Sequence, residues 1–224
     1  MEKELVSIII PTLNEEKNIR RLLSGVKEQL KGYKYEIIVV DKHSPDKTAS
    51  IARRMGAKVL YDDFGKGSAI IAGMRAAKGD VLISMDADLS NEPNEFPLLI
   101  DAIKIGYDIC MGSRFLTGGG SEDIPPIRRL GNEFFVWLVN MLFHAHFTDL
   151  CYGYRSFRKG VLEKLDLHEK GFGIEAEISI RAIKKGLKII EMPSTEKKRA
   201  AGEGKLRTFH DGYIILRTIL MNVY

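Results

Sequence analysis

Apolar residues follow two different patterns in the first ninety positions of the chain. Short continuous runs, rich in β-branched residues, lie at 5–10, 36–40, 58–61 and 81–85. Runs of this kind are typical of strands that are buried on both faces. Between them, apolar residues recur every three or four positions, as from Ile19 to Leu30, which is typical of amphipathic helices, and Asn14 is the expected N-cap of the first helix. The alternation predicts a parallel, doubly wound sheet of the α/β class.

The second half of the chain alternates less regularly. Its expected elements are a helix at about 95–105, a strand at 107–112, a mobile Gly- and Pro-rich loop at 116–127, a long helix at about 129–147, a short strand within 148–157, a helix from 172, a strand at 188–193, a basic loop at 196–207 and a helix at 211–224. Neither an internal repeat nor a linker is visible, so we expect one domain over residues 1–224.

The helix expected at about 129–147 is apolar on nearly all sides. Such a helix either is deeply buried or lies against lipid. It is too short to cross a bilayer, which takes about 20 apolar residues. Trp137 is a suitable residue for a membrane interface. The sequence leaves both interpretations open, a core helix and an interfacial helix.

Composition narrows the class of protein. The 224 residues are 45% hydrophobic and 29% charged, with a net charge of +4, as in an ordinary globular domain. This charge fits a protein that binds phosphates or an anionic membrane, and without a long basic run interleaved with aromatics we expect no nucleic-acid partner. Cys110 and Cys151 have neither a metal-binding spacing nor a disulfide framework, and the charged N-terminus is not typical of a signal peptide. We therefore expect a cytoplasmic protein.

Polar side chains follow three of the expected strands. Asn14 and Glu15 come after the first strand, Asp41 after the second, and Asp86 and Asp88 after the fourth. Right-handed crossovers place the carboxyl ends of parallel strands along one edge of the sheet, where ligands collect. Alternation along an extended segment points both carboxylates of the Asp-x-Asp pair to one side, where they suit Mg²⁺ or Mn²⁺ bound to a diphosphate. A polar turn at a strand end is the alternative.

Two other phosphate-binding sequences are missing. No Gly-x-Gly-x-x-Gly follows the first strand and no Gly-x4-Gly-Lys-Ser/Thr occurs, which disfavours a dinucleotide fold and a P-loop NTPase. Lys66 stands between Gly65 and Gly67, and we interpret it as a solvated turn residue rather than a phosphate ligand.

Taken in order, the motifs resemble the family 2 glycosyltransferases, with their A-type nucleotide-sugar-binding fold. The first half carries Ile10-Pro-Thr-Leu-Asn-Glu15, Val40-Asp41-x-x-Ser44-x-Asp46-x-Thr48, Gly65-Lys-Gly67 and Met85-Asp-Ala-Asp88-Leu. The second half is similar to the subfamily that loads a hexose onto dolichyl or undecaprenyl phosphate, through Gly112-Ser-Arg114-Phe, Arg128-x-x-Gly-Asn132, Thr148-Asp-x-x-x-Gly153-x-Arg155-x-Phe157, Gly171-Phe-x-x-Glu175-x-Glu177, Glu191-x-Pro193 and Gly202-Glu-x-Lys205-Leu. The resemblance implies a nucleotide-sugar-binding half at 1–112 and an acceptor half at 113–224.

The resemblance also implies roles for single residues. The donor would be bound by Pro11, Leu13, Glu15, Val39, Asp41, Asp86, Ala87, Asp88, Arg199 and Lys205. Within this set, Asp41 would accept a hydrogen bond from the base, and the basic loop would fold over the diphosphate. The metal ligands would be Asp86, Asp88 and Ser90, and the acceptor phosphate would be held by Arg114, Arg128 and Asn132. The chain departs from the family at three places: Ser90 replaces a common Gln, Asn132 a common Ser, and Lys42 the usual second acid after Asp41.

The implied reaction transfers a hexose, with inversion, from GDP-mannose or UDP-glucose to a polyprenyl or dolichyl phosphate. The attacking phosphate monoester is already anionic, because its second pKa is about 6, so no strong base is required. What is required is control of charge, and the catalytic residues would be Asp86, Asp88, Arg114 and Arg128. The expected partners are the nucleotide sugar, the lipid and the inner face of the cell membrane, which the protein would bind peripherally. The sequence does not determine the oligomeric state.

Three other functions are considered. A soluble glycosyltransferase with a hydroxyl acceptor would need a carboxylate base, and Glu175 is the candidate. A nucleotidyltransferase would share the Asp-x-Asp pair, but the Gly-rich N-terminal loop of that class is missing. In a noncatalytic binding protein, the convergence of acids and arginines would have no purpose. Glu175 and Glu177 are otherwise candidates for sugar contacts or for a structural pair with Arg155, and the structural role is favoured for Glu177.

Overall fold

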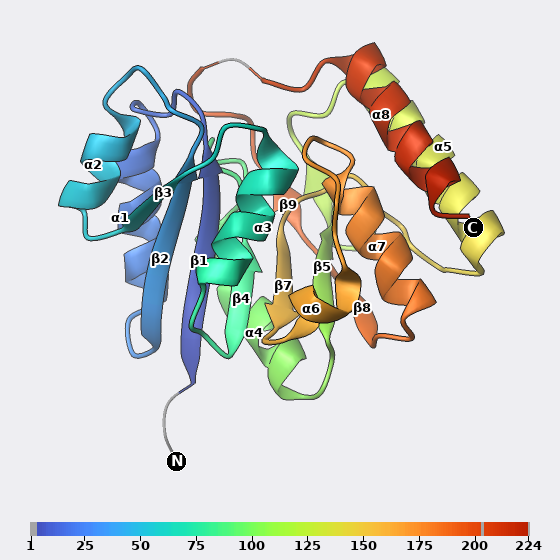
Figure 1. Ribbon diagram of the computed structural model, residues 1–224, viewed down its shortest axis with the longest axis horizontal. Coiled ribbons are helices and arrows are strands. Elements are labelled where there is room, and N and C mark those ends of the chain that lie inside the picture. The colour runs from blue at the N-terminus through green and yellow to red at the C-terminus, as the bar shows by residue number, and fades with distance from the viewer. Residues whose placement is uncertain (1–3, 203, 224) are drawn as a thin grey trace.

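The computed structural model describes residues 4–202 and 204–223, and within them the strands form one large mixed sheet and one small ribbon (Figure 1). The large sheet consists of β1 (Leu5–Thr12), β2 (Lys34–Asp41), β3 (Lys58–Tyr61), β4 (Val81–Ser84), β5 (Ile109–Ser113), β7 (Arg155–Arg158) and β8 (Ile189–Pro193). The ribbon pairs β6 (Gly120–Ser121) with β9 (Thr195–Glu196). The helices are α1 (Ile19–Gln29), α2 (Thr48–Arg54), α3 (Lys66–Ala76), α4 (Phe96–Lys104) after the short 3₁₀ turn Pro93–Glu95, α5 (Pro126–Phe143), α6 (Val161–Leu165), α7 (Ile174–Lys184) and α8 (Thr208–Met221).

The order of the large sheet is β3-β2-β1-β4-β7-β5-β8. Strands β1 to β4 pair in parallel, as do β5 and β8, whereas β7 is antiparallel to both of its neighbours. The predicted doubly wound, mostly parallel sheet is therefore confirmed. Because β1, β2 and β4 all run in one direction, the residues that follow them meet at one edge of the sheet.

Both faces of the sheet are buried. Along β1, Val6, Ile8 and Ile10 pack into a core beneath α1 and α4, whereas Ile9 packs on the opposite face with residues of α3, α5 and α7. All four side chains are fully buried. The continuous apolar runs of the sequence arise from this two-sided burial.

The first helix begins later than predicted. Asn14 is not its N-cap: α1 starts at Ile19, and Asn14 has the left-handed backbone conformation (φ 57°). Its backbone N–H donates to Ser44 Oγ at 2.8 Å, and a turn follows in which Glu15 O accepts from the N–H groups of Asn18 and Ile19. The strand-to-helix connection is thus held to the loop after β2 rather than capped from within.

The long apolar helix ends earlier than predicted. Helix α5 ends at Phe143, not at 147, because His144 has a left-handed backbone (φ 52°) and the Asn140 amide exchanges two hydrogen bonds of 2.9 Å with the backbone of Phe147. Helix α8 begins at Thr208 rather than 211, and Tyr224 lies outside the described residues. The predicted loop at 116–127 contains β6, and the short helix α6 was not expected.

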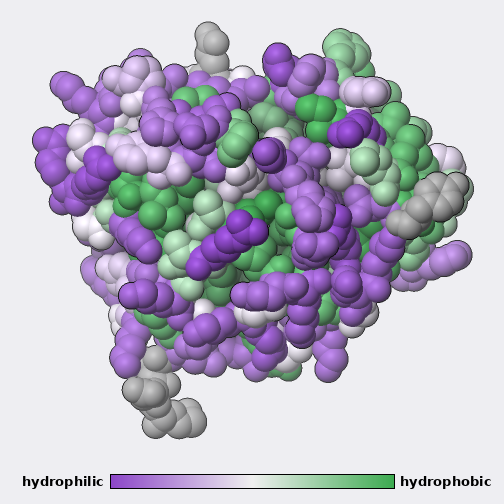
Figure 2. Space-filling view, viewed as in Figure 1, coloured by the Kyte–Doolittle hydropathy of each residue, from purple (hydrophilic) through white to green (hydrophobic). Residues whose placement is uncertain are grey.

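One face of α5 packs on the core and the opposite face is exposed. Phe135, Leu138 and Val139 are buried. The exposed apolar residues recur every three or four positions and are Ile127, Leu130, Phe134, Trp137 and Met141. Helix α8 packs beside α5 and exposes Phe209 and Tyr213 (Figure 1). Figure 2 shows hydrophobic residues gathered at the edge of the molecule where these two helices lie.

Candidate active site

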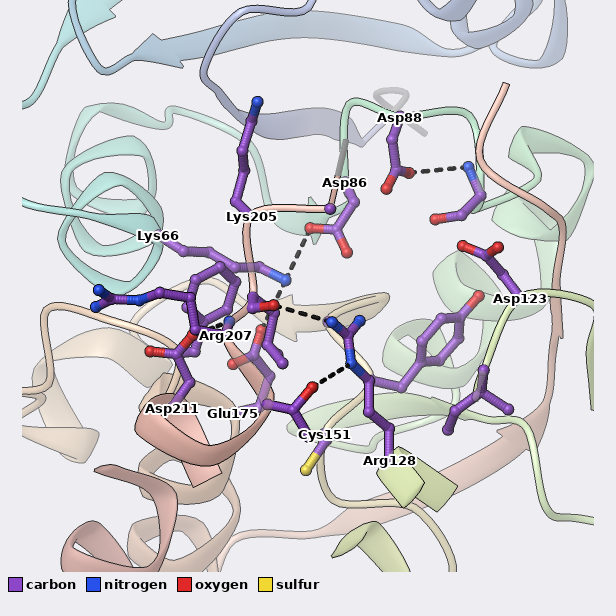
Figure 3. A pocket seen from close by; sticks show the side chains of 18 of the residues that line it. Lys66, Asp86, Asp88, Asp123, Arg128, Cys151, Glu175, Lys205, Arg207 and Asp211 are labelled. Carbon is purple, nitrogen blue, oxygen red and sulfur yellow. Dashed lines mark hydrogen bonds and ion pairs between the residues drawn. The ribbon is translucent and has the colours of Figure 1, made fainter. Parts of the chain in front are cut away.

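A cavity of about 710 Å³ opens where β1 and β4 end and extends toward α5 and α8 (Figure 3). It brings together residues from both halves of the chain. The predicted site residues that line it are Pro11, Leu13, Glu15, Asp86, Ala87, Asp88, Ser90, Arg114, Arg128, Asn132, Arg199 and Lys205. Two predicted donor residues, Val39 and Asp41, do not line it. Residues as far apart in the sequence as Pro11 and Lys205 thus share one solvent-accessible space.

The Asp86-x-Asp88 pair directly follows β4. The N–H of Asp86 donates to the Asn91 side chain at 2.7 Å, and Asp88 Oδ1 accepts from the N–H of Ser90 at 3.0 Å. Leu89 between them has a left-handed backbone (φ 68°), which turns the chain back on itself. The local bonds hold the two carboxylates at the cavity wall.

Each of these carboxylates is paired with a cationic side chain. Lys66 Nζ lies 2.8 Å from Asp86 Oδ1, and Arg199 Nη2 lies 2.5 Å from Asp88 Oδ2. Arg199 also lies 3.6 Å from Glu15 Oε1. Burial raises the pKa of Glu15, and the hydrogen bond from Asn18 and the charge of Arg199 oppose that increase. The acids therefore form a negatively charged wall, and Lys66 and Arg199 each pair with it through a positively charged side chain.

The donor set fits a divalent cation in part. Asp86, Asp88 and Ser90 offer hard oxygen atoms on one wall, and the cations that already pair with the acids show that the wall attracts positive charge. Among residues 4–202 and 204–223 there is no group of three or more His, Cys, Asp and Glu side chains that could hold a metal alone. A bound ion would need further oxygen ligands, such as those of a diphosphate and water.

Lys66 was misinterpreted from the sequence. It is not a solvated turn residue: its side chain is only 15% exposed, and its ammonium lies 2.8 Å from Asp86 and 2.9 Å from Glu175 Oε1. Burial lowers the pKa of this ammonium, but the two carboxylates raise it more, so the net shift is upward and Lys66 stays charged. The turn lies close to the cavity because a loop from the second half of the chain packs against its glycines: a Cβ on Gly67 would approach Glu169 O to 2.4 Å.

Asp41 does not line the cavity but forms hydrogen bonds next to it. Its side chain is fully buried and accepts hydrogen bonds from Thr12 Oγ1 at 2.8 Å and from the N–H and Oγ of Ser44 at 2.8 and 2.7 Å. Val39 is in the core. Lys42, which replaces an acid usual in the family, does line the cavity. The protein itself thus uses the hydrogen-bonding capacity of Asp41 to connect the loops after β1 and β2.

The described residues of the basic loop, 196–202 and 204–207, lie along one side of the cavity. Lys197 N–H donates to Ser90 O at 2.9 Å, and Ala200 N–H donates to Asp88 O at 3.2 Å. The Asn18 amide donates to Ala201 O at 3.1 Å. Glu203, part of the Gly202-Glu-x-Lys205 motif, lies outside the described residues. These contacts lay the loop across the Asp-x-Asp turn and bring Arg199 to Asp88.

Arg114 lies in the part of the cavity wall that the second half of the chain forms, and acidic side chains bind it. Its guanidinium pairs with Asp149 through Nε at 2.7 Å and Nη2 at 3.0 Å, and Nη1 donates to Glu196 at 3.1 Å. Burial lowers the pKa of Arg114, but the two acids raise it more, so the net shift is upward. Two carboxylates of the protein, those of Asp149 and Glu196, thus neutralise its positive charge.

Arg128 and Asn132 have spare donors. Arg128, in the first turn of α5, donates to Thr208 Oγ1 at 3.2 Å and to Leu206 O at 2.9 Å, and no described carboxylate pairs with it. Asn132 is 2% exposed; its Oδ1 accepts from the N–H groups of Leu150 and Cys151, while its Nδ2 has no hydrogen-bond partner among the described residues. Both residues line the cavity, so an anion there would meet an uncompensated guanidinium, and the unused amide donor of Asn132 is buried in the adjoining wall.

The predicted partner of Glu177 was wrong, although its role is structural. Glu177 pairs with Arg181 at 3.1 Å, and its carboxylate accepts hydrogen bonds from the backbone N–H groups of His168 and Glu169. Arg155 instead donates to backbone carbonyl oxygens, those of Leu150, Tyr152 and Glu175, and to Ser179 Oγ. The buried Arg155 side chain thus connects the loop before β7 to the start of α7, where the Glu175 side chain lines the cavity.

Comparison with known proteins supplies independent evidence. The model of the family described as glycosyl transferase family 2 matches residues 7–166. The dolichol-phosphate mannosyltransferase of Pyrococcus furiosus is 40% identical over 210 residues, which are 90% of this chain and 59% of that protein. The chain therefore spans about three fifths of that relative. The dolichyl-phosphate hexose transferase of Haloferax volcanii is 33% identical over 216 residues, 96% of this chain and 92% of that protein.

Solved structures agree on the fold. The glucosyl-3-phosphoglycerate synthase of Mycobacterium tuberculosis, in complex with Mn²⁺, UDP and glucosyl-3-phosphoglycerate, superposes with a TM-score of 0.78 at 21% identity, covering 98% of this chain and 80% of that one. The likeness confirms the predicted A-type glycosyltransferase fold.

Proposed function

We propose that this chain, which belongs to glycosyl transferase family 2, transfers a hexose from a nucleotide sugar to the phosphate of a polyprenyl lipid at a membrane surface. One observation carries the proposal: a single cavity joins the Asp86-x-Asp88 wall to Arg128, Asn132 and the apolar helices α5 and α8. The names of the Pyrococcus and Haloferax relatives support a dolichyl phosphate acceptor. Mannose is the first candidate for the hexose, because the most similar of these two relatives is named a mannosyltransferase.

In the proposed reaction, a lipid phosphate oxygen attacks the anomeric carbon of the donor while the bond from that carbon to the nucleoside diphosphate breaks. The products are the hexosyl lipid phosphate and the free nucleoside diphosphate, and the anomeric configuration inverts. The acceptor oxygen is anionic near neutral pH, so it needs no base. Glu175, which the hydroxyl-acceptor alternative would use as a base, is paired with Lys66, and the comparisons do not favour that alternative.

Different residues would stabilise the charges of the leaving diphosphate and of the acceptor phosphate. Asp86 and Asp88, with Ser90 nearby, would hold Mg²⁺ or Mn²⁺, which when bound offsets the charge that grows on the leaving diphosphate. Arg199 and Lys205 lie close enough to the same wall to serve the diphosphate from the other side. Arg128 and Asn132 would bind the acceptor phosphate and orient its oxygen, and orientation of this kind contributes several kcal/mol, about 7 in good cases.

The test is transfer of radiolabelled hexose into a lipid product. GDP-mannose and UDP-glucose are each supplied with Mn²⁺ and a polyprenyl phosphate, and extractable label is measured. We expect transfer from one donor that depends on the metal and on the phosphate of the lipid. The same polyprenol without its phosphate is the control. Equal labelling of that alcohol, or no transfer from either donor, contradicts the proposal.

The exposed face of α5 supports the membrane part of the proposal. Five apolar side chains, from Ile127 to Met141, are exposed on one face of α5, and the adjacent helix α8 exposes Phe209 and Tyr213. Together they give the surface that an interfacial helix pair presents. Lys205 and Arg207, directly before α8, add positive charge near this edge, which favours anionic lipid. No helix of the described residues is long and apolar enough to cross a membrane.

Replacing Trp137 with Glu is expected to weaken binding to anionic phospholipid vesicles about 10-fold or more, because a buried aromatic contributes about 1.5–3 kcal/mol. Trp137 is 57% exposed, so the melting temperature should not change. Sedimentation with vesicles measures the effect. The matched control is Ile105→Glu, since Ile105 is 74% exposed but follows α4, away from α5. Equal losses in the two variants would mean that the α5 face has no special role.

A further inference from the structure

We propose that Lys66 and Glu175 form the subsite that binds the hydroxyl groups of the transferred hexose. The proposal rests on the proposed function and extends it. Neither residue belongs to the Asp-x-Asp pair or to the groups assigned to the acceptor phosphate. Both line the cavity, and their charged atoms lie 2.9 Å apart.

The position of the pair matches the position that the sugar must occupy. The hexose is bonded to the diphosphate on one side and is attacked by the acceptor phosphate on the other. Lys66 contacts Asp86 of the diphosphate wall, whereas Glu175 lies in the first turn of α7, in the acceptor half. Figure 3 shows Asp86, Lys66, Glu175 and Arg128 arranged around the same space. A hexose that joins the two phosphates therefore passes beside this pair.

The surrounding backbone is shaped to admit the pair. A Cβ on Gly153 would lie 2.7 Å from Lys66 Nζ and 3.0 Å from Glu175 Oε1, so a larger residue there would displace the ammonium from its present position. Arg155, which is 1% exposed, holds Glu175 O at 2.9 Å and Tyr152 O at 3.0 Å. The backbone of Glu175 and the loop before β7 are thus fixed relative to each other before any ligand arrives, which limits the reorganisation that binding a sugar there requires.

The chemistry of the pair suits neutral hydroxyl groups. A carboxylate accepts hydrogen bonds only, and an ammonium donates up to three. Two donors of Lys66 face Asp86 and Glu175, which leaves one for a sugar oxygen. The second oxygen of Glu175, Oε2, makes no hydrogen bond with a described residue and can accept from a hydroxyl. Together they offer an acceptor and a donor side by side, which complements two adjacent ring hydroxyls.

Stability alone does not account for the pair. Side-chain exposures of 15% for Lys66 and 5% for Glu175 mean that both charges lose most of their hydration. Buried ion pairs often stabilise a fold no better than apolar residues of the same volume. A charged group kept beside a ligand cavity at that cost is expected to act on the ligand.

The experiment measures how much the sugar adds to donor binding. The protein is titrated with each nucleotide in the presence of Mn²⁺. The titrations give its affinities for GDP and GDP-mannose, or for UDP and UDP-glucose, whichever pair the wild-type protein binds. We expect Glu175→Gln to reduce the ratio of the two affinities about 10- to 100-fold, because a charged hydrogen bond to the sugar is lost, and to leave the nucleoside diphosphate affinity unchanged. Glu163→Gln, an exposed change on α6, is the matched control. A monodeoxy donor should lose less affinity in Glu175→Gln than in wild type.

Two results would overturn the subsite. One is a Glu175→Gln protein that keeps the wild-type ratio, and the other is an equal loss of affinity for the diphosphate and the nucleotide sugar, which would make Glu175 a support for Asp86. Transfer of hexose to lipid by the wild-type protein, together with either result, rejects the subsite but keeps the proposed function. Absence of both donor binding and transfer in the wild type rejects the two together.

Discussion

Asp88→Asn is expected to lower the rate of hexose transfer about 10²- to 10³-fold, the cost of removing one preorganised electrostatic contact from a developing charge. The amide is almost the size of the carboxylate, and Ser90 N–H can still donate to its oxygen, so the turn after β4 should persist. What disappears is the negative charge that holds Arg199 at 2.5 Å and that would bind the divalent cation. Initial rates at saturating donor, measured over a range of Mn²⁺ concentrations, give the effect.

The Mn²⁺ series also separates two causes of the loss. Weaker metal binding alone would let high Mn²⁺ restore part of the rate, whereas a lost contact to the reacting groups would leave a deficit at every concentration. Asp101→Asn, an exposed change on α4, is the matched control and should retain the wild-type rate. A wild-type rate in Asp88→Asn at low Mn²⁺ would rule out Asp88 as a ligand.

The fold was predictable because its signals are local and strong. Continuous runs such as 5–10 and 36–40 can be satisfied only by burial on both faces, and that requirement leads directly to a parallel sheet covered by helices. Helix ends were less predictable, since α5 stops where the Asn140 amide bonds the backbone of Phe147, seven residues further on. Such a bond depends on tertiary position and leaves no pattern in the sequence.

The candidate site was predictable where a residue stands at the end of a strand, as Asp86 and Asp88 do. It was not predictable where a residue works through a distant segment. Lys66 resembled a solvated turn because its partner Glu175 is more than a hundred positions away, and the loop that presses on Gly67 belongs to the other half of the chain. The close glycines on both sides of Lys66 were the one available signal, because they indicate a close approach of another backbone.

Arg114 and Arg128 looked equivalent in the sequence, and the structure distinguishes them. Arg114 is 8% exposed and is bound to the fully buried Asp149, so Arg114→Gln leaves that acid without its partner. We expect the free energy of unfolding to fall by about 3–5 kcal/mol. Arg128 forms no ion pair with a carboxylate of the described residues, and the two hydrogen bonds that it makes to Leu206 and Thr208 are worth only about 1–2 kcal/mol together.

Arg128→Gln should therefore fold and yet fail to use the lipid. We expect kcat/KM for polyprenyl phosphate to fall about 10²- to 10³-fold, because the charge-assisted contact that would face the acceptor phosphate is removed, while the affinity for the nucleotide sugar stays the same. Arg129→Gln is the matched control: the neighbouring guanidinium is exposed and paired with Glu133 at 3.0 Å. Steady-state rates over a range of lipid concentrations, with thermal unfolding of all three variants, test the distinction. The assignment fails if Arg114→Gln keeps the wild-type melting temperature and Arg128→Gln keeps the wild-type rate of hexose transfer. The roles of the two arginines would then be exchanged, and the acceptor phosphate would bind Arg114 in place of its acidic partners.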